Sequence, residues 1–190
     1  MTSTAPSHSR VCFDEPSERF HTLNQVLSTT EIAATALEVN GFTPGELRDT
    51  NKQTLAQVLT QAYWWCEKND VKLFAGQNVN FDHRFMLDGF DKCDLFWMSK
   101  RFGHRMLDLH STAFARLVQL GLQPPEKMDL DTALMIAGLP RRDTKRENKH
   151  SALDDAILET EAFYRYIFGQ SRLSEYSQYP VPKRLIVKER

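Results

Sequence analysis

Two short segments carry the residue types that hydrolytic chemistry requires. In Gly76–Asp82 a loop containing glycine and asparagine leads to an aspartate, and in His150–Asp155 a histidine, four residues and an aspartate follow one another. Carboxylate oxygens are the ligands that Mg²⁺ prefers, and a histidine with an unperturbed pKa of about 6.5 can accept a proton from water. These residue types suit metal-assisted hydrolysis of a phosphodiester.

Each segment also has a purely structural interpretation. Asp82, Asp154 and Asp155 all fall in the first turn of an expected helix. Carboxylates there are stabilised by free N–H groups and by the helix dipole. Taken singly, each acid is explained by helix capping, and we assign Asp154 to that role.

Alternating short apolar runs and helical patterns predict the elements that position these residues. Val71–Ala75 follows a polar stretch and predicts a buried strand, after which a tight loop leads into a helix carrying Phe81 and Phe85. Strand, loop and helix in this order indicate an α/β fold. A hairpin is expected over 11–23, and further helices over 30–39, 50–68, 109–120, 130–137 and 152–168.

Composition narrows the functional classes. The chain has 190 residues, a formal net charge of −1 and 41% hydrophobic residues, which excludes a globally basic coat for nucleic acid. No apolar run approaches the ~20 residues that span a bilayer, so no membrane association is expected. Its three cysteines, Cys12, Cys66 and Cys93, form no zinc pattern and predict a reducing, cytoplasmic setting.

The order and spacing of the two segments resemble the second and third motifs of the DnaQ-like (DEDDh) 3′–5′ exonucleases of the RNase H-like superfamily. Asn40–Thr43 is similar to that family's His-Gly-Ile-Thr turn, and Leu107–Asp108 to its aspartate-containing segment after the second motif. The similarity covers residues 11–168. It implies an RNase H-like mixed sheet flanked by helices, and removal of nucleoside monophosphates from nucleic-acid 3′ ends.

The resemblance also implies roles for individual residues. His150 would be the general base, Asp155 a direct ligand of Mg²⁺ or Mn²⁺, and Asp82 a supporting ligand of a second ion. The substrate would be DNA or RNA with a free 3′ end. Asn78 and Phe81, beside Asp82, are candidate contacts to the nucleic acid. The basic residues of the loop next to His150 are further candidates: Arg141, Arg142, Lys145, Arg146 and Lys149.

The family's first motif, Asp-x-Glu on the first central strand, is not found. The one tight acidic candidate upstream of Asp82 is Asp14–Glu15, whose adjacent side chains would point to opposite faces of a strand. We therefore expect that the first central strand is missing or altered, that metal binding is weakened, and that a partner polypeptide or a second copy completes the sheet. The alternative is a catalytically silent exonuclease fold that binds either nucleic acid or a replication or repair protein.

The remaining segments are assigned from composition. Residues 1–10 are expected to be a disordered lead-in, and residues 169–190 an extended basic tail. The loop 141–149 has five basic and two acidic residues, which suits either a solvated loop or contact with substrate phosphates. Four aromatic rings are expected mainly to pack in the core, although such rings can also stack on bases: Trp64, Trp65, Phe96 and Trp97. Phe96 and Trp97 follow the acidic stretch 88–94, so partial exposure is expected for them.

Overall fold

The structure is a computed structural model that describes residues 43–142 and 152–186. The expected hairpin over 11–23 and the helix over 30–39 lie outside these residues. The elements in chain order are α2 (Pro44–Leu47), α3 (Leu55–Lys68), β1 (Phe74–Gly76), α4 (Val79–Lys92), α5 (Phe96–Ser99), β2 (Met106–Asp108), α6 (Leu109–Gln119), α7 (Leu130–Ile136), α8 (Ala152–Phe168) and the 3₁₀ turn η1 (Ser174–Tyr176).

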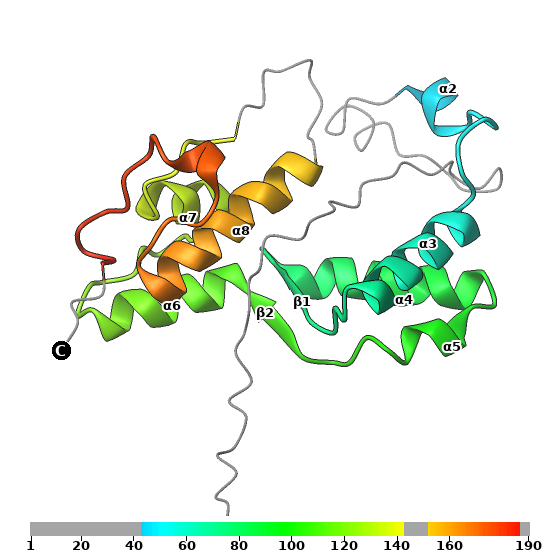
Figure 1. Cartoon of the computed structure of the whole chain (residues 1–190), viewed down its shortest axis with the longest axis horizontal. Helices are drawn as coiled ribbons and strands as arrows, with labels where there is room; N and C mark the ends of the chain where they lie inside the picture. Colours follow the sequence, from blue (N-terminus) through cyan, green and yellow to red (C-terminus); the bar gives the residue numbers. More distant parts are fainter. Residues whose placement is uncertain (1–42, 143–151, 187–190) are drawn as a thin grey trace, which may run out of the picture.

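A parallel pair of short strands lies between two groups of helices (Figure 1). Phe74 pairs with Met106 and Gly76 with Asp108, while α4 and α5 form the connection between the strands. The mixed α/β class predicted from the sequence is confirmed. The expected buried strand over 71–75 begins later, at Phe74, and ends at Gly76, and Ala75 is exposed.

Local sequence explains where several helices begin. Thr54 caps α3 by accepting the Gln57 N–H, and the Gln57 side chain accepts the Thr54 N–H in return, which makes a capping box. Asp129 caps α7 through the Thr132 N–H at 2.9 Å. The last helix covers the range predicted for it, Ala152–Phe168. None of the helices within 43–142 and 152–186 is long and apolar enough to cross a bilayer.

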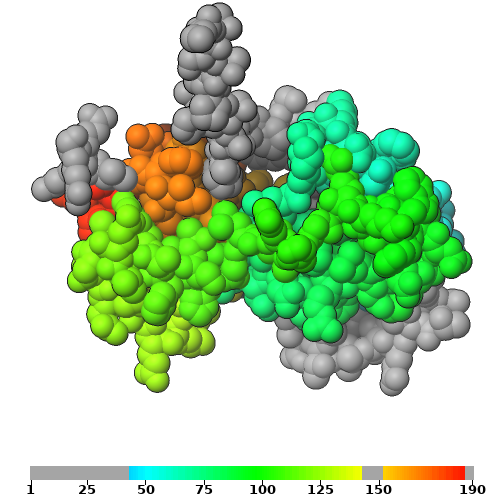
Figure 2. All heavy atoms as spheres, turned by 90° about the horizontal axis from the view of Figure 1, so that it is seen from below, coloured from blue at the N-terminus to red at the C-terminus, as the bar shows by residue number. Residues whose placement is uncertain are grey.

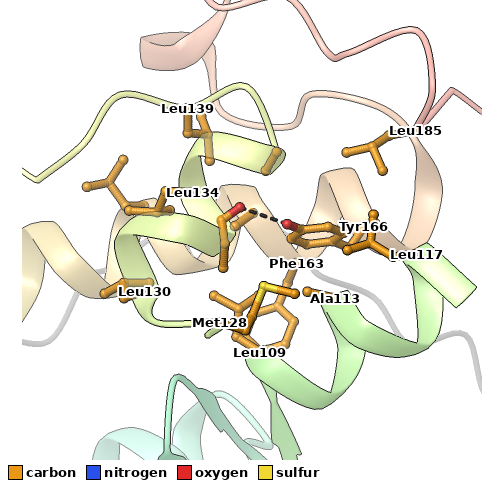
Figure 3. Close-up of a cluster of buried hydrophobic side chains, with 14 residues drawn as sticks. Leu109, Ala113, Leu117, Met128, Leu130, Leu134, Leu139, Phe163, Tyr166 and Leu185 are labelled. Carbon is orange, nitrogen blue, oxygen red and sulfur yellow. Dashed lines mark hydrogen bonds between the residues drawn. The ribbon is translucent and has the colours of Figure 1, made fainter. Parts of the chain in front are cut away.

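The helices α6, α7 and α8 enclose the larger of two apolar clusters, which we call the C-terminal core (Figure 3). Leu109, Leu134 and Phe163 are almost fully buried in it. The Tyr166 hydroxyl, also buried there, donates to the Ala133 carbonyl at 2.7 Å, so the one polar atom of that ring is satisfied.

A buried ion pair anchors the chain after α8 to this core. Arg165 and Glu161 are both 0% exposed, with Nε donating to Oε1 at 2.7 Å. The Arg165 guanidinium also donates to the Tyr179 carbonyl at 2.8 Å, and Glu161 accepts the Leu173 N–H at 2.8 Å. Part of the segment that the sequence suggested as a tail is thereby packed, and Leu185 is fully buried.

The helices α3, α4 and α5 enclose a smaller cluster, which we call the N-terminal core. Its buried members are Leu59, Cys66, Phe90, Met98 and Phe102. Seen from below, the two helical groups form two masses of atoms that meet at the centre (Figure 2). The strand pair therefore joins these two cores, and Asp82 and Asp155 lie on helices from opposite sides of it.

Candidate functional site

The loop from Gly76 to Asn78 joins the end of β1 to α4 and places Asp82 in the first turn of that helix. Asn78 adopts the left-handed conformation, with φ of 56° and ψ of 35°. Asparagine tolerates this conformation better than most residues other than glycine. The chain can therefore turn directly from the strand into the helix, and α4 begins at the carboxyl end of the strand pair.

Two carboxylates hold this loop from opposite sides. The Gln77 N–H donates to Glu159 Oε2 at 3.1 Å, and the Asn78 N–H donates to Asp108 Oδ2 at 2.9 Å. A Cβ atom at Gly76 would lie 3.0 Å from Glu159 Oε2, so glycine permits the close approach of α8 to the strand end. The loop is thereby fixed to both α8 and β2.

Two aspartates act on the carboxyl group of Glu159 at this point. Glu159 lies one turn after Asp155 on α8, and its pKa is raised to about 7 by burial and by the negative charges of Asp155 and Asp82, against the hydrogen bond from Gln77. Desolvation also raises the pKa of Asp82. The two aspartates that the sequence singled out, 73 positions apart, both act on the same buried carboxyl group.

Arg142 connects Asp155 to α7. Its Nε lies 2.9 Å from Asp131 Oδ1, and a terminal nitrogen lies 3.6 Å from Asp155 Oδ2. This guanidinium lowers the pKa of Asp131, chiefly through its hydrogen bond. Arg142, which the sequence suggested as a phosphate contact, thus offsets the charge of Asp155, while Arg141 is exposed.

Other residues from the sequence prediction are only partly accounted for. His150 and the basic residues Lys145, Arg146 and Lys149 lie outside the described residues. Phe81 is 56% exposed and stacks on Phe85 with ring centroids 4.6 Å apart.

The acids have the right chemistry for a hard divalent cation but an incomplete arrangement. Carboxylate oxygens are what Mg²⁺ and Mn²⁺ bind. Yet among residues 43–142 and 152–186 no group of three histidine, cysteine, aspartate or glutamate side chains is close enough to hold an ion. Asp155 is paired with Arg142 and Glu159 with the Gln77 N–H. The described side chains alone do not make a metal site.

Sequence reasoning missed Glu159. The available signal was its position four residues after Asp155, because residues at this spacing share a helix face. The motif His150–Asp155, which indicated Asp155, contains no residue that corresponds to Glu159. Its contact with Gln77, 82 positions away, depends on tertiary packing.

Comparisons with protein-family models, with curated proteins and with solved structures give no match.

Proposed function

We propose that this chain is an RNase H-like module of the DEDDh 3′–5′ exonuclease type, which hydrolyses the terminal phosphodiester of a nucleic-acid strand. The observation that carries the proposal is that Asp82 and Asp155, from two different helices, both act on Glu159, whose carboxyl group holds the loop at the carboxyl end of β1. Ligands of open α/β sheets bind in the crevice outside the carboxyl ends of the strands. The order of the motifs along the chain supports the same assignment.

The proposal gives the residues separate tasks. Asp155 and Asp82 would contribute carboxylate oxygens toward Mg²⁺ or Mn²⁺, which in this chemistry stabilises charge on the phosphoryl oxygens. His150 would accept the proton of the attacking water. Glu159 and Asp108 hold the loop before α4 and so fix the position of Asp82.

A strand labelled at its 3′ end tests this activity while Mn²⁺ is titrated. We expect stepwise release of nucleoside monophosphates that stops in EDTA. Asp155→Asn is expected to slow release at least ~100-fold, as for loss of a group that acts in the transition state. Asp82→Asn and His150→Ala are expected to slow it as well.

Two control variants separate the site from its surroundings. Asp154→Asn changes the exposed neighbouring acid on the same helical turn. Asp131→Asn removes the second partner of Arg142 without touching Asp155. Both should retain turnover; equal rates in wild type, Asp155→Asn and His150→Ala would contradict the assignment.

A second candidate is a catalytically silent exonuclease fold that binds nucleic acid or a replication or repair protein. The ion pair between Arg142 and Asp155 favours it, since that carboxylate is already offset by a cation. The absence of an Asp-x-Glu motif from the sequence favours it too. It predicts strand binding without turnover, unchanged by chelation.

A further inference from the structure

A groove of about 660 Å³ runs beside β2. All three residues of the strand, Met106–Asp108, line this groove. Successive residues of a strand point to opposite faces of a sheet, so a hollow that all three line must follow the edge of the strand. One edge of β2 is paired with β1, and β2 lies between β1 and α6 (Figure 1). The groove therefore follows the other edge of β2, which has no strand partner within the described residues.

The backbone of β2 has unused hydrogen-bonding groups along this edge. In a pair of strands, alternate residues of each strand direct their N–H and C=O groups away from the partner strand. Outside the pairing with β1, no backbone group of residues 105–107 is hydrogen-bonded in the described parts of the chain, 43–142 and 152–186. Such unpaired donors and acceptors are a template for pairing with another extended chain.

Two helices form the walls of the groove. The last turn of α8 contributes Tyr166 and Ile167. One face of α6, on which residues four apart are neighbours, contributes Ser111, Thr112, Ala115, Arg116 and Gln119. Met106, Ala115 and Ile167 give the groove apolar surface, so covering it with apolar side chains is favourable.

Arg116 brings a positive charge to this groove without a counter-ion. Its guanidinium donates to two neutral oxygens, Gln119 Oε1 at 2.8 Å and the Leu185 carbonyl at 3.1 Å. No carboxylate forms an ion pair with it within 43–142 and 152–186, and its buried Nε–H has no acceptor there. A guanidinium has five N–H donors, and its hydrogen bonds to carboxylates are among the strongest in proteins. The groove is therefore complementary to an acidic side chain.

We propose that this groove binds an extended acidic segment of a partner protein, which adds a third strand along β2 and sets one carboxylate against Arg116. In strand addition the main-chain hydrogen bonds supply affinity, and alternate side chains supply specificity. A second copy of this chain, paired through its own β2, is a poorer occupant. The carboxylate that its strand offers, Asp108, already accepts the Ser111 and Asn78 N–H groups at 2.9 Å each.

Fluorescence anisotropy with labelled hexapeptides tests the groove. The peptides alternate valine and threonine, are blocked by acetylation and amidation, and carry one glutamate, at a different position in each. We expect at least one to bind with a Kd below about 1 mM, and its glutamine counterpart to bind about tenfold more weakly, on the scale of a hydrogen bond to a charged group. Methylation of alternate backbone nitrogens should abolish binding, because it removes the main-chain donors.

Variants of the groove locate the binding. Arg116→Gln should weaken the glutamate peptide to the level of the glutamine peptide and leave the glutamine peptide unchanged, as expected for two coupled groups. Ala115→Glu, at an exposed position on the same wall, should abolish binding, because its carboxylate repels that of the peptide. Arg84→Gln removes an exposed arginine on α4 outside the groove, and as the matched control it should bind as wild type does. Circular dichroism of each variant checks that the fold is retained.

The proposal is overturned if no peptide of the set binds, if the N-methylated peptide binds equally well, or if both groove variants keep wild-type affinity. Binding by non-amidated peptides alone would assign the groove to a chain end, and a dimer in sedimentation that Ala115→Glu dissociates would assign it to a second copy. Both results overturn the proposal as well. Failure of the proposed function is distinguishable, because Asp82, Asp155 and Glu159 do not line this groove, and peptide binding is measured without nucleic acid or metal.

Discussion

The two cores that flank the strand pair are stabilised differently. Among residues 43–142 and 152–186, the C-terminal core has fourteen buried members and lies beside the fully buried Arg165–Glu161 pair. The N-terminal core has five buried members in the same ranges, and its helices carry several exposed aromatic rings. The candidate site draws on both, because Asp155 and Glu159 lie on α8 while Asp82 lies on α4.

This difference indicates which side of the candidate site is held by more extensive packing. On the C-terminal side, the helix that carries Asp155 and Glu159 is buried along Leu158, Ala162 and Phe163. On the N-terminal side, α4 depends on a smaller core and on the two carboxylates that hold its preceding loop. The position of Asp82 therefore depends on Glu159 and Asp108, which hold the loop, as well as on the buried Val79 and His83 of the same helix.

Exposed aromatic rings mark the weaker side. Trp64, Phe96 and Trp97 are 57%, 57% and 55% exposed. The expectation of core packing was wrong for Trp64, whereas Trp65 packs against the N-terminal core. The exposure of Phe96 and Trp97 agrees with the partial exposure expected for them. Tyr63 lies edge-on to Trp64 and Trp97, with centroids 5.1 and 5.5 Å away. The apolar residues of α3 therefore extend over a wider face of the helix than the neighbouring elements cover.

Arg165→Met should have the largest effect, because it removes the buried ion pair that distinguishes the C-terminal core. It leaves Glu161 buried without its cation and leaves the carbonyl of Tyr179 without its donor. Breaking a buried ion pair by removing one partner costs about 3–5 kcal/mol, so we expect the free energy of unfolding in urea to fall by that much. Arg84→Ala, at an exposed position on α4, is the control. A loss below about 1 kcal/mol would show that the pair does not secure the C-terminal core.

Phe90→Ala tests the smaller core. Phe90 is 0% exposed, and its removal should lower the free energy of unfolding by about 3 kcal/mol, the lower end for such a change, because a small core can collapse around the gap. Phe85, on the same helix, is 63% exposed, and Phe85→Ala should cost no more than about 0.5 kcal/mol. Similar losses in the two variants would mean that α4 buries a different face.

Glu159→Gln has the smallest expected effect and tests the contact between α8 and the loop before α4. The pKa of Glu159 is raised from 4.5 to about 7 in the folded chain, so between these values the folded state binds more protons than the unfolded state. The contribution of Glu159 to stability is therefore most favourable below pH 4.5 and is lost as pH rises through about 7. We expect the free energy of unfolding of wild type to fall by about 1–2 kcal/mol over this pH range. This figure is below what the full pKa shift would give, because the carboxyl group is partly in contact with solvent.

The glutamine variant should remove this part of the pH dependence and be more stable than wild type at pH 8, as thermal unfolding between pH 5 and 8 can measure. Its amide oxygen can still accept the Gln77 N–H. Glu126→Gln, an exposed acid in a loop, should leave the profile unchanged. Parallel profiles for wild type and Glu159→Gln would contradict the assigned pKa.

Local sequence was sufficient wherever a signal is confined to one element. The apolar stripe of 152–168 predicted α8 because residues three and four apart share a helix face. The cap at Asp129 and the stop at Gly138, which has φ of 75°, placed α7 to within a residue or two. Boundaries of short strands were less certain, since three residues of β1 are defined by pairing with β2 and not by their own pattern.

The sequence by itself determined which residues could do chemistry and on which elements they lie: Asp82 at the start of one helix and Asp155 at the start of another. Only the tertiary structure decided what surrounds them. Glu159 reaches the Gln77 amide across 82 positions, and Arg142 reaches Asp155 from beyond α7. The physical reason is that burial and electric field depend on what packs around a carboxyl group, which a one-dimensional pattern does not contain.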